Sequence, residues 1–199
     1  MSTRRVVHAP SADEQRSLYP LLTAVVVPRP IAWISTVDAD GVGNLAPHSF
    51  FTVACANPAI VQFTSVGAKD TLRNVRATGE FVVSMVSEPL MDAANATAAP
   101  YAAEVDEAEA VGLRMEPSAT VRPFRVADSP TSLECRLHST HELGDSTIVL
   151  GTVTAVTVLE TALDGDHPTM AALAPVSRLG RDEWGRPPEV VRLARPTTA

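Results

Sequence analysis

Ser132-Leu-Glu-Cys-Arg-Leu-His138 and Ile148-Val-Leu-Gly-Thr-Val-Thr-Ala-Val-Thr-Val158, with a turn near Gly144-Asp145 between them, form the stretch that decides the fold. The first segment alternates strictly between apolar and polar residues, which is the period of a β strand with one buried face. The second segment is rich in β-branched residues, which favour strands. Together they predict a long hairpin. Gly151 inside the second strand indicates a bulge or the close passage of another backbone.

Shorter β-type runs precede this hairpin. They are rich in β-branched and apolar residues, are separated by turn residues, and cover residues 23–27, 31–37, 42–46, 49–56, 59–64 and 81–86. Pro28 and Pro30 cannot donate to a ladder, so they predict a corner or an edge. Successive runs with hairpin turns and only short helices between them predict a mainly β fold. We expect an antiparallel barrel rather than a parallel α/β sheet.

The helices are expected to be short and peripheral. Thr71–Ala77 is the most convincing one, with Asp70 as its N-cap and Gly79 just past its end. Residues 88–112 are rich in Ala and Glu and predict one or two further short helices. Their acidic side chains are expected to form a solvated face, and they are Glu104, Asp106, Glu107 and Glu109. The first twenty residues are expected to form an arm or a short helix outside the core.

The length of 199 residues favours a single domain, 1–199. We expect its core over about residues 20–160, and residues 161–199 as a C-terminal extension that packs on the barrel or on a partner subunit. No apolar run approaches the roughly 18 residues that cross a bilayer, and no signal peptide is apparent, so a cytoplasmic protein without a membrane role is expected. Cys55 and Cys135 have no metal-ligand spacing and are expected to be free, buried thiols.

The charge pattern singles out one residue. The net charge is −7, which argues against nucleic-acid binding because a phosphate backbone needs a broad positive face. A small anion can still be held by a helix start and one or two cations. Lys69 is the only lysine among sixteen basic residues. A genome that favours arginine explains most of this bias, but the single lysine also indicates a place where a compact ammonium is required.

A strand, a loop and a helix start meet at Thr64-Ser-Val-Gly-Ala-Lys-Asp-Thr-Leu-Arg-Asn74. The first N–H groups of a helix have no internal partner, and the helix dipole makes that end partly positive. Hydroxyls before the helix, a lysine at its start and a threonine in its first turn would surround a phosphate with donors. The segment is not a Walker A loop. The alternative is an ordinary helix start with a surface lysine.

A second candidate segment is Asn44-Leu-Ala-Pro-His-Ser-Phe-Phe51. Its proline is expected to break the ladder and to leave backbone groups free to face a ligand. Small Ala46 and Ser49 would allow a flat ring to approach closely. The alternative is an edge strand that its proline protects against aggregation. No nucleophile–base pair and no metal-ligand cluster can be assembled from the spacing, so no catalytic residue and no metal ligand are predicted.

Several motifs occur together in an order that resembles the flavin reductase-like, FMN-binding split-barrel family. The matching segments cover about residues 20–195, and they are Pro28-Arg-Pro-Ile-Ala-Trp-Ile-Ser-Thr36, Asp40-Gly41, the segment 44–51, Asn57-Pro58, Lys69-Asp-Thr-Leu-Arg-Asn74, Thr78-Gly-Glu-Phe-Val-Val83, Ser132-Leu-Glu-Cys135, Gly151-Thr-Val and Pro175-Val-Ser-Arg-Leu-Gly180. His48 and Trp184 depart from the usual pattern of that family.

The resemblance implies a Greek-key split barrel that forms a homodimer and holds FMN in a groove at or near the subunit interface. By that resemblance, the phosphate and ribityl chain would contact Thr64, Ser65, Lys69, Asp70 and Thr71. The isoalloxazine edge would contact the backbone around Asn44, Ala46, Pro47, Ser49 and Phe50. Arg178 would lie close to the flavin or to the substrate.

The resemblance also implies an FMN-dependent oxidoreductase. Electrons would pass from NAD(P)H through FMN to a free flavin, a partner monooxygenase or another small acceptor. Such cofactor chemistry needs little acid–base help from the protein, which agrees with the absence of a nucleophile–base pair. One alternative is an FMN-binding electron-transfer module without its own nicotinamide site. Another is a split-barrel protein that binds no flavin.

Overall fold

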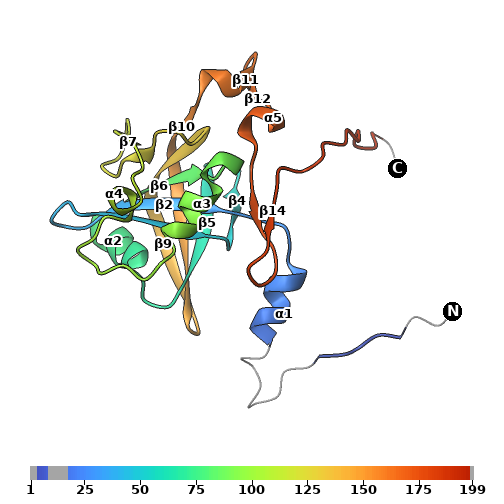
Figure 1. Cartoon of the computed structure of the whole chain (residues 1–199), viewed down its shortest axis with the longest axis horizontal. Helices are drawn as coiled ribbons and strands as arrows, with labels where there is room; N and C mark the ends of the chain where they lie inside the picture. The colour runs from blue at the N-terminus through green and yellow to red at the C-terminus, as the bar shows by residue number, and fades with distance from the viewer. Residues whose placement is uncertain (1–3, 9–17, 198–199) are drawn as a thin grey trace.

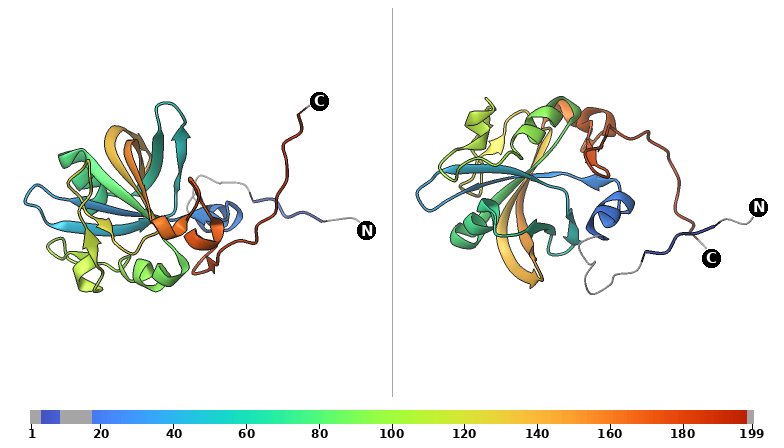
Figure 2. Two further views of the ribbon diagram at one scale, coloured as in Figure 1. Left: turned by 90° about the horizontal axis from the view of Figure 1, so that it is seen from above. Right: turned by 60° about the horizontal axis from the view of Figure 1, so that its bottom comes forward.

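The protein is built around a seven-stranded antiparallel sheet that curls into a barrel (Figures 1 and 2). The computed structural model describes residues 4–8 and 18–197. In sheet order the strands are β3 (Gly43–His48), β2 (Ala32–Val37), β6 (Glu80–Met85), β9 (Thr131–Leu143), β10 (Ser146–Val158), β5 (Ile60–Val66) and β4 (Phe51–Cys55). The mainly β split-barrel fold expected from the sequence is confirmed, including the long β9–β10 hairpin.

The two edge strands of this sheet are neighbours in the sequence. Only Ser49 and Phe50 separate β3 from β4, although these strands lie at opposite ends of the sheet order. The Thr64 N–H donates to the Phe50 carbonyl at 2.9 Å, which continues the β4–β5 pairing into this corner. The short link therefore draws the two edges of the sheet together and gives the barrel its shape.

The barrel interior is filled by aromatic and aliphatic side chains. Phe63 and Phe81 are fully buried, and their rings meet edge to face at 5.5 Å. The β9–β10 register shifts between Leu150 and Gly151, so the predicted bulge is confirmed. The close neighbour of Gly151 is the ring of Phe81 rather than another backbone, and a Cβ at this position would overlap the ring.

Small elements cover the outer face of β2 and β6. They are α3 (Met91–Ala96) preceded by the 3-10 turn η2 (Glu88–Leu90), α4 (Glu107–Ala110), and the β7–β8 pair (Met115–Glu116 and Arg125–Val126). Fully buried Trp33 anchors this layer, because its Nε1–H donates to Thr97 Oγ1 at 2.9 Å.

The predicted helix at 71–77 is present as α2 (Asp70–Thr78). Its N-cap is Lys69, so the assignment of Asp70 as the cap was wrong by one residue. Gly79 follows the helix with φ 73°, a left-handed conformation that glycine adopts without strain.

The expected strand at 23–27 is also wrong, because its first half belongs to helix α1 (Leu18–Val25). The helix is stabilised by a residue just beyond its end, and this residue is itself held by a carbonyl far away in the sequence. The guanidinium of Arg29 donates to the carbonyls of Thr23 and Val26, which satisfies the C-terminal end of the helix. The same guanidinium donates to the Leu179 carbonyl at 2.8 Å. An element remote in the chain thus stabilises the helix against its local β preference.

The C-terminal segment packs partly on the barrel. Its elements are η3 (Glu160–Ala162), β11 (Leu163–Asp164), β12 (His167–Pro168), α5 (Met170–Leu173), β13 (Ser177–Arg178) and β14 (Trp184–Gly185). Strand β13 pairs with β14 and with β1 (Arg29–Pro30), and the chain beyond β14 extends away from the barrel (Figure 1). No helix in the described ranges is long and apolar enough to cross a membrane.

Both cysteines are free thiols, as expected. Cys135 is buried in the barrel interior, and burial raises its pKa to about 12. Cys55 is only half-buried, so the expectation that both are buried holds for Cys135 alone.

Candidate functional site

A cleft of about 350 Å³ opens between the edge strand β3, the start of α2 and the segment 97–101. Six of the predicted site residues line it, and they are Asn44, Ala46, Pro47, Lys69, Asp70 and Thr71. The structure therefore brings together the two segments that the sequence singled out. The segment 97–101, together with His48 and Glu107, completes the lining and was not predicted.

A smaller cavity of about 150 Å³ adjoins the cleft. Both are lined by Pro47 and Ala98, and the smaller one adds Ser49 and Arg178. The Arg178 guanidinium lies 5.2 Å from the ring centre of Trp184, in a cation–π contact. Two more predicted residues thus lie at the far end of the site.

Three predicted site residues line neither cavity. Ser65 is buried, and its hydroxyl donates to the Gly67 carbonyl at 3.2 Å. Phe50 faces the opposite side of the corner, where its ring meets Tyr19 and lies under the Arg29 guanidinium. Thr64 pairs with Ile148 inside the sheet. These side chains shape the neighbourhood of the cleft rather than its surface.

The start of α2 provides donors for an anion. The first intrahelical donor is the Arg73 N–H, which bonds to the Lys69 carbonyl. The N–H groups of residues 70–72 therefore precede the helical ladder, and no side chain caps the helix. The exposed Lys69 adds its charge beside them. This donor set fits a phosphate group, which can accept several N–H bonds at the positive end of the helix dipole.

Strand β3 presents its free edge to the cleft. The expectation that Pro47 breaks the ladder is wrong, because pairing continues through Trp33–Pro47 and Ala32–His48. The proline lies on an edge strand, where its missing N–H costs no ladder bond on the open side. The Leu45 N–H points away from β2, and backbone groups of an antiparallel strand alternate, so the Pro47 carbonyl also faces outward.

Buried amides and hydroxyls fix the wall of the cleft. Asn44 Nδ2 donates to Thr71 Oγ1 at 3.1 Å and to Thr36 Oγ1 at 3.2 Å. Asn74 Nδ2 donates to the same Thr36 oxygen at 3.2 Å. This network fixes the positions of β2, β3 and α2 relative to one another. The Thr71 side-chain oxygen is consequently held in one position beside the start of α2.

His48 is buried in the wall of the cleft. Its Nε2 lies 3.4 Å from Thr71 Oγ1, and its ring centre lies 4.9 Å from that of Phe63. Burial and the charge of Lys69 lower its pKa to about 4, so the ring is neutral at physiological pH.

The prediction that Glu107 lies on a solvated face is wrong. The side chain is buried, and Oε2 accepts the Leu45 N–H at 2.8 Å. Burial raises its pKa, although the hydrogen bond from Leu45 acts in the opposite direction. The physical reason is that the edge strand β3 has an N–H that needs an acceptor, and α4 supplies one.

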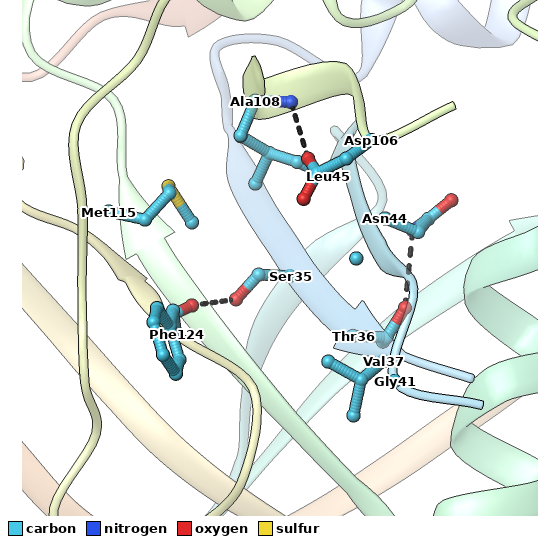
Figure 3. A pocket seen from close by; sticks show the side chains of 11 residues that line it. Ser35, Thr36, Val37, Gly41, Asn44, Leu45, Asp106, Ala108, Met115 and Phe124 are labelled. Atoms are coloured by element: carbon cyan, nitrogen blue, oxygen red, sulfur yellow. Dashed lines mark hydrogen bonds between the residues drawn. The ribbon is translucent and has the colours of Figure 1, made fainter. Parts of the chain in front are cut away.

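A separate cavity of about 180 Å³ lies on the other side of this α4 contact (Figure 3). Ser35, Asp106, Met115 and Phe124 contribute to its wall. Asp106 caps α4 through the Ala108 N–H, and the Ser35 hydroxyl bonds to the Phe124 carbonyl. Among the residues that line this cavity is a carboxylate but no Lys or Arg, so it does not suit a phosphate.

The described residues were also compared with the ligand sets that hold metal ions. Within residues 4–8 and 18–197, no group of three or more His, Cys, Asp or Glu side chains is arranged to hold an ion. The site is a cleft on the edge of a split barrel, with donors at the start of α2 that fit an anion, and it adjoins a smaller cavity lined by an arginine.

Comparison with known proteins agrees with this class of site. Residues 24–172 match the flavin reductase like domain, and the chain belongs to the flavin reductase-like family of oxidoreductases. A protein of Deinococcus radiodurans is 38% identical over 202 residues, which cover 95% of this chain and 89% of that one.

Two solved structures extend the comparison. Nitrilotriacetate monooxygenase component B from Bacillus cereus is 29% identical, with a TM-score of 0.90 over 96% of this chain and 100% of that chain. The 2-nitrobenzoate 2-nitroreductase of Pseudomonas fluorescens is also 29% identical, with a TM-score of 0.87 over 96% and 98% of the two chains. Both align along nearly the whole length of this protein.

Proposed function

We propose that the protein is an FMN-dependent oxidoreductase that takes electrons from NAD(P)H and passes them to a flavin or another small acceptor. The observation behind this proposal is the uncapped start of α2, which opens with Lys69 and Thr71 into a cleft along β3. A mononucleotide has one terminal phosphate, and the cleft has one such group of donors. When bound, FMN supplies the redox chemistry that the side chains lack.

The residues of the cleft have distinct proposed roles. Lys69, the Thr71 hydroxyl and the first N–H groups of α2 bind the phosphate. The free edge of β3 at Ala46 and Pro47 lies along the ring system, where small side chains allow close approach and the outward Pro47 carbonyl can accept a ring N–H. Arg178 and Ser49 line the adjoining cavity, where an electron donor or acceptor would meet the ring.

A homodimer is part of this proposal. The described α1 helix is apolar, yet none of its residues is buried. Val25, Val53 on β4 and Leu193 in the C-terminal segment are 62%, 70% and 93% exposed. A partner subunit that packs on α1 would cover these apolar side chains. Light scattering after gel filtration would measure the dimer, and Val25→Glu combined with Val53→Glu should yield monomers. A single-chain mass for the wild-type protein would contradict the dimer.

The function is tested with the purified protein under anaerobic conditions. Visible flavin bands should co-purify or appear on addition of FMN, and NADH or NADPH should bleach them. The proposed setting is the cytoplasm, where both nicotinamides are available. Bound FMN that neither nicotinamide bleaches would contradict the reductase and favour an electron-transfer module. Free FMN, a monooxygenase and 2-nitrobenzoate are then compared as acceptors, since one similar structure is a monooxygenase component and another is a 2-nitrobenzoate nitroreductase.

A further inference from the structure

The His48 ring faces the proposed phosphate site through a single hydroxyl. Its Nε2 lies 3.4 Å from Thr71 Oγ1, and the ring also takes part in a hydrogen bond with the Thr64 backbone. His48 is 6% exposed and Thr71 is 1% exposed, so bulk water does not compete freely for these contacts. The orientation of the Thr71 hydroxyl therefore depends on whether His48 Nε2 acts as a hydrogen-bond donor or as an acceptor.

The Thr71 hydroxyl has one hydrogen and two lone pairs. Asn44 Nδ2 already donates to one lone pair at 3.1 Å. A neutral His48 that donates to the Thr64 backbone has an unprotonated Nε2, and this nitrogen accepts the Thr71 hydrogen. A protonated His48 donates from both nitrogens and fills the second lone pair. The Thr71 hydrogen is then free only toward the cleft.

We propose that His48 is a positioning residue that couples binding of the FMN phosphate to the uptake of one proton. This rests on the proposed function, because it needs the phosphate beside Lys69 and Thr71. The proton comes from solvent and adds to Nε2 of the imidazole. The Thr71 hydroxyl rotates and donates to a phosphate oxygen. Nothing is oxidised or reduced, and no other bond is made or broken.

The electrostatics of the cleft favour this coupling. Burial and the charge of Lys69 hold the pKa of His48 at about 4. A phosphate dianion offsets the charge of Lys69 and favours the imidazolium. The other ionisable groups of the cleft are Asp70 on α2, Tyr101 on the segment 97–101 and Glu107 on α4. Glu107 can also take up a proton when an anion binds, so its contribution has to be separated from that of His48.

The test measures proton uptake when FMN binds. Calorimetric titrations are run at pH 5.5 and 7.5 in buffers with different ionisation enthalpies, with wild type and His48→Gln. The phosphate of FMN has its own pKa near 6, but this contribution is shared by both proteins and cancels in the difference. If binding returns the His48 pKa to about 6.5, wild type should take up about 0.9 proton more than His48→Gln at pH 5.5, and about 0.1 more at pH 7.5.

The same linkage predicts an affinity change. Wild type should gain about tenfold in FMN affinity between pH 7.5 and 5.5, relative to the change in His48→Gln. Glu107→Gln should keep this difference, as should His141→Gln, which removes an exposed histidine on β9. Equal proton uptake by wild type and His48→Gln would overturn the coupling while leaving FMN binding intact.

A second measurement covers the case in which His48→Gln does not fold or bind. The His48 ring resonances of the wild type are titrated by NMR without ligand and with saturating FMN. The midpoint should rise by at least two pH units on binding, and an unchanged midpoint would overturn the coupling. A wild-type protein that binds no FMN would instead refute the proposed function, and the coupling with it.

Discussion

Replacing Lys69 with alanine should weaken FMN binding about 10- to 30-fold without unfolding the protein. A hydrogen bond to a charged group contributes about 1.5–3 kcal/mol. Lys69 is exposed at the mouth of the cleft, so solvent screening places its contribution at about 1.5–2 kcal/mol. That range corresponds to about 10- to 30-fold in Kd. The ammonium has no ion-pair partner among the described residues, so its removal should leave the fold intact.

The assay is a titration of FMN fluorescence at fixed ionic strength, with circular dichroism to verify the fold. Lys69→Arg should retain most of the affinity, because it keeps the charge. Arg76→Ala is the matched control, since Arg76 lies on the same helix, pairs with Glu142 on β9 and does not line the cleft. A Kd for Lys69→Ala within twofold of wild type, or an equal loss in Arg76→Ala, would refute the assignment of the phosphate to this helix start.

Three further predictions concern the scaffold that positions the cleft. Glu134→Gln should lower the free energy of unfolding by about 2–4 kcal/mol in urea titrations at pH 7, because the buried carboxylate accepts three hydrogen bonds from Ala119 and Thr120. Burial alone would raise the pKa of Glu134, but those hydrogen bonds lower it below the usual 4.5. The stabilisation is therefore present above pH 4.5 and is lost as the pH falls through the pKa of the folded state. The Glu134→Gln variant should not show this loss of stability in acid. Gly151→Ala should destabilise the barrel by about 1–3 kcal/mol in thermal melts, since the new Cβ overlaps Phe81. Arg29→Ala should release α1, seen as faster hydrogen exchange in residues 18–25, because carbonyls at the end of the helix lose their donor.

Each of these predictions has a control within the chain. Glu142 lies on the exposed end of β9, so Glu142→Gln should leave the free energy of unfolding unchanged. Phe81→Leu should relieve part of the cost of Gly151→Ala, and strictly additive losses would contradict the overlap. Arg186→Ala removes an exposed arginine and should not alter exchange in α1. Unchanged protection of α1 in Arg29→Ala would show that the guanidinium does not hold the helix.

The sequence predicted the elements whose signals are local. Alternation over residues 132–138 and the β-branched run at 148–158 identified the long hairpin. Gly79 marked the C-terminal end of α2, whereas the N-cap was assigned to Asp70 instead of Lys69. The same patterns failed at residues 23–27, because a β-branched run reads as a strand. The carbonyls that Arg29 satisfies, and the contact of Arg29 with Leu179, are visible only in the folded chain.

The candidate site was predictable in part for the same reason. The helix start and the edge strand each have a recognisable local pattern, and the fold brings them to one cleft. Glu107 was placed on the surface because its neighbours in the sequence are acidic and polar. Its burial depends on the Leu45 N–H, which is 62 residues away in the chain. The setting of His48 likewise depends on Thr71, which only tertiary packing brings near.

The pairing of β1 with β13 bears on how the chain is made. Arg29 and Pro30 are synthesised well before their strand partners Ser177 and Arg178, because Arg29 and Leu179 are 150 residues apart in the sequence. The Arg29 guanidinium consequently gains its full set of acceptors only after residue 179 has left the ribosome, because the Leu179 carbonyl is one of them. The barrel strands can pair before then. The contact between residues 29–30 and 177–179 beside the corner at Phe50 therefore forms after the barrel strands are available to pair.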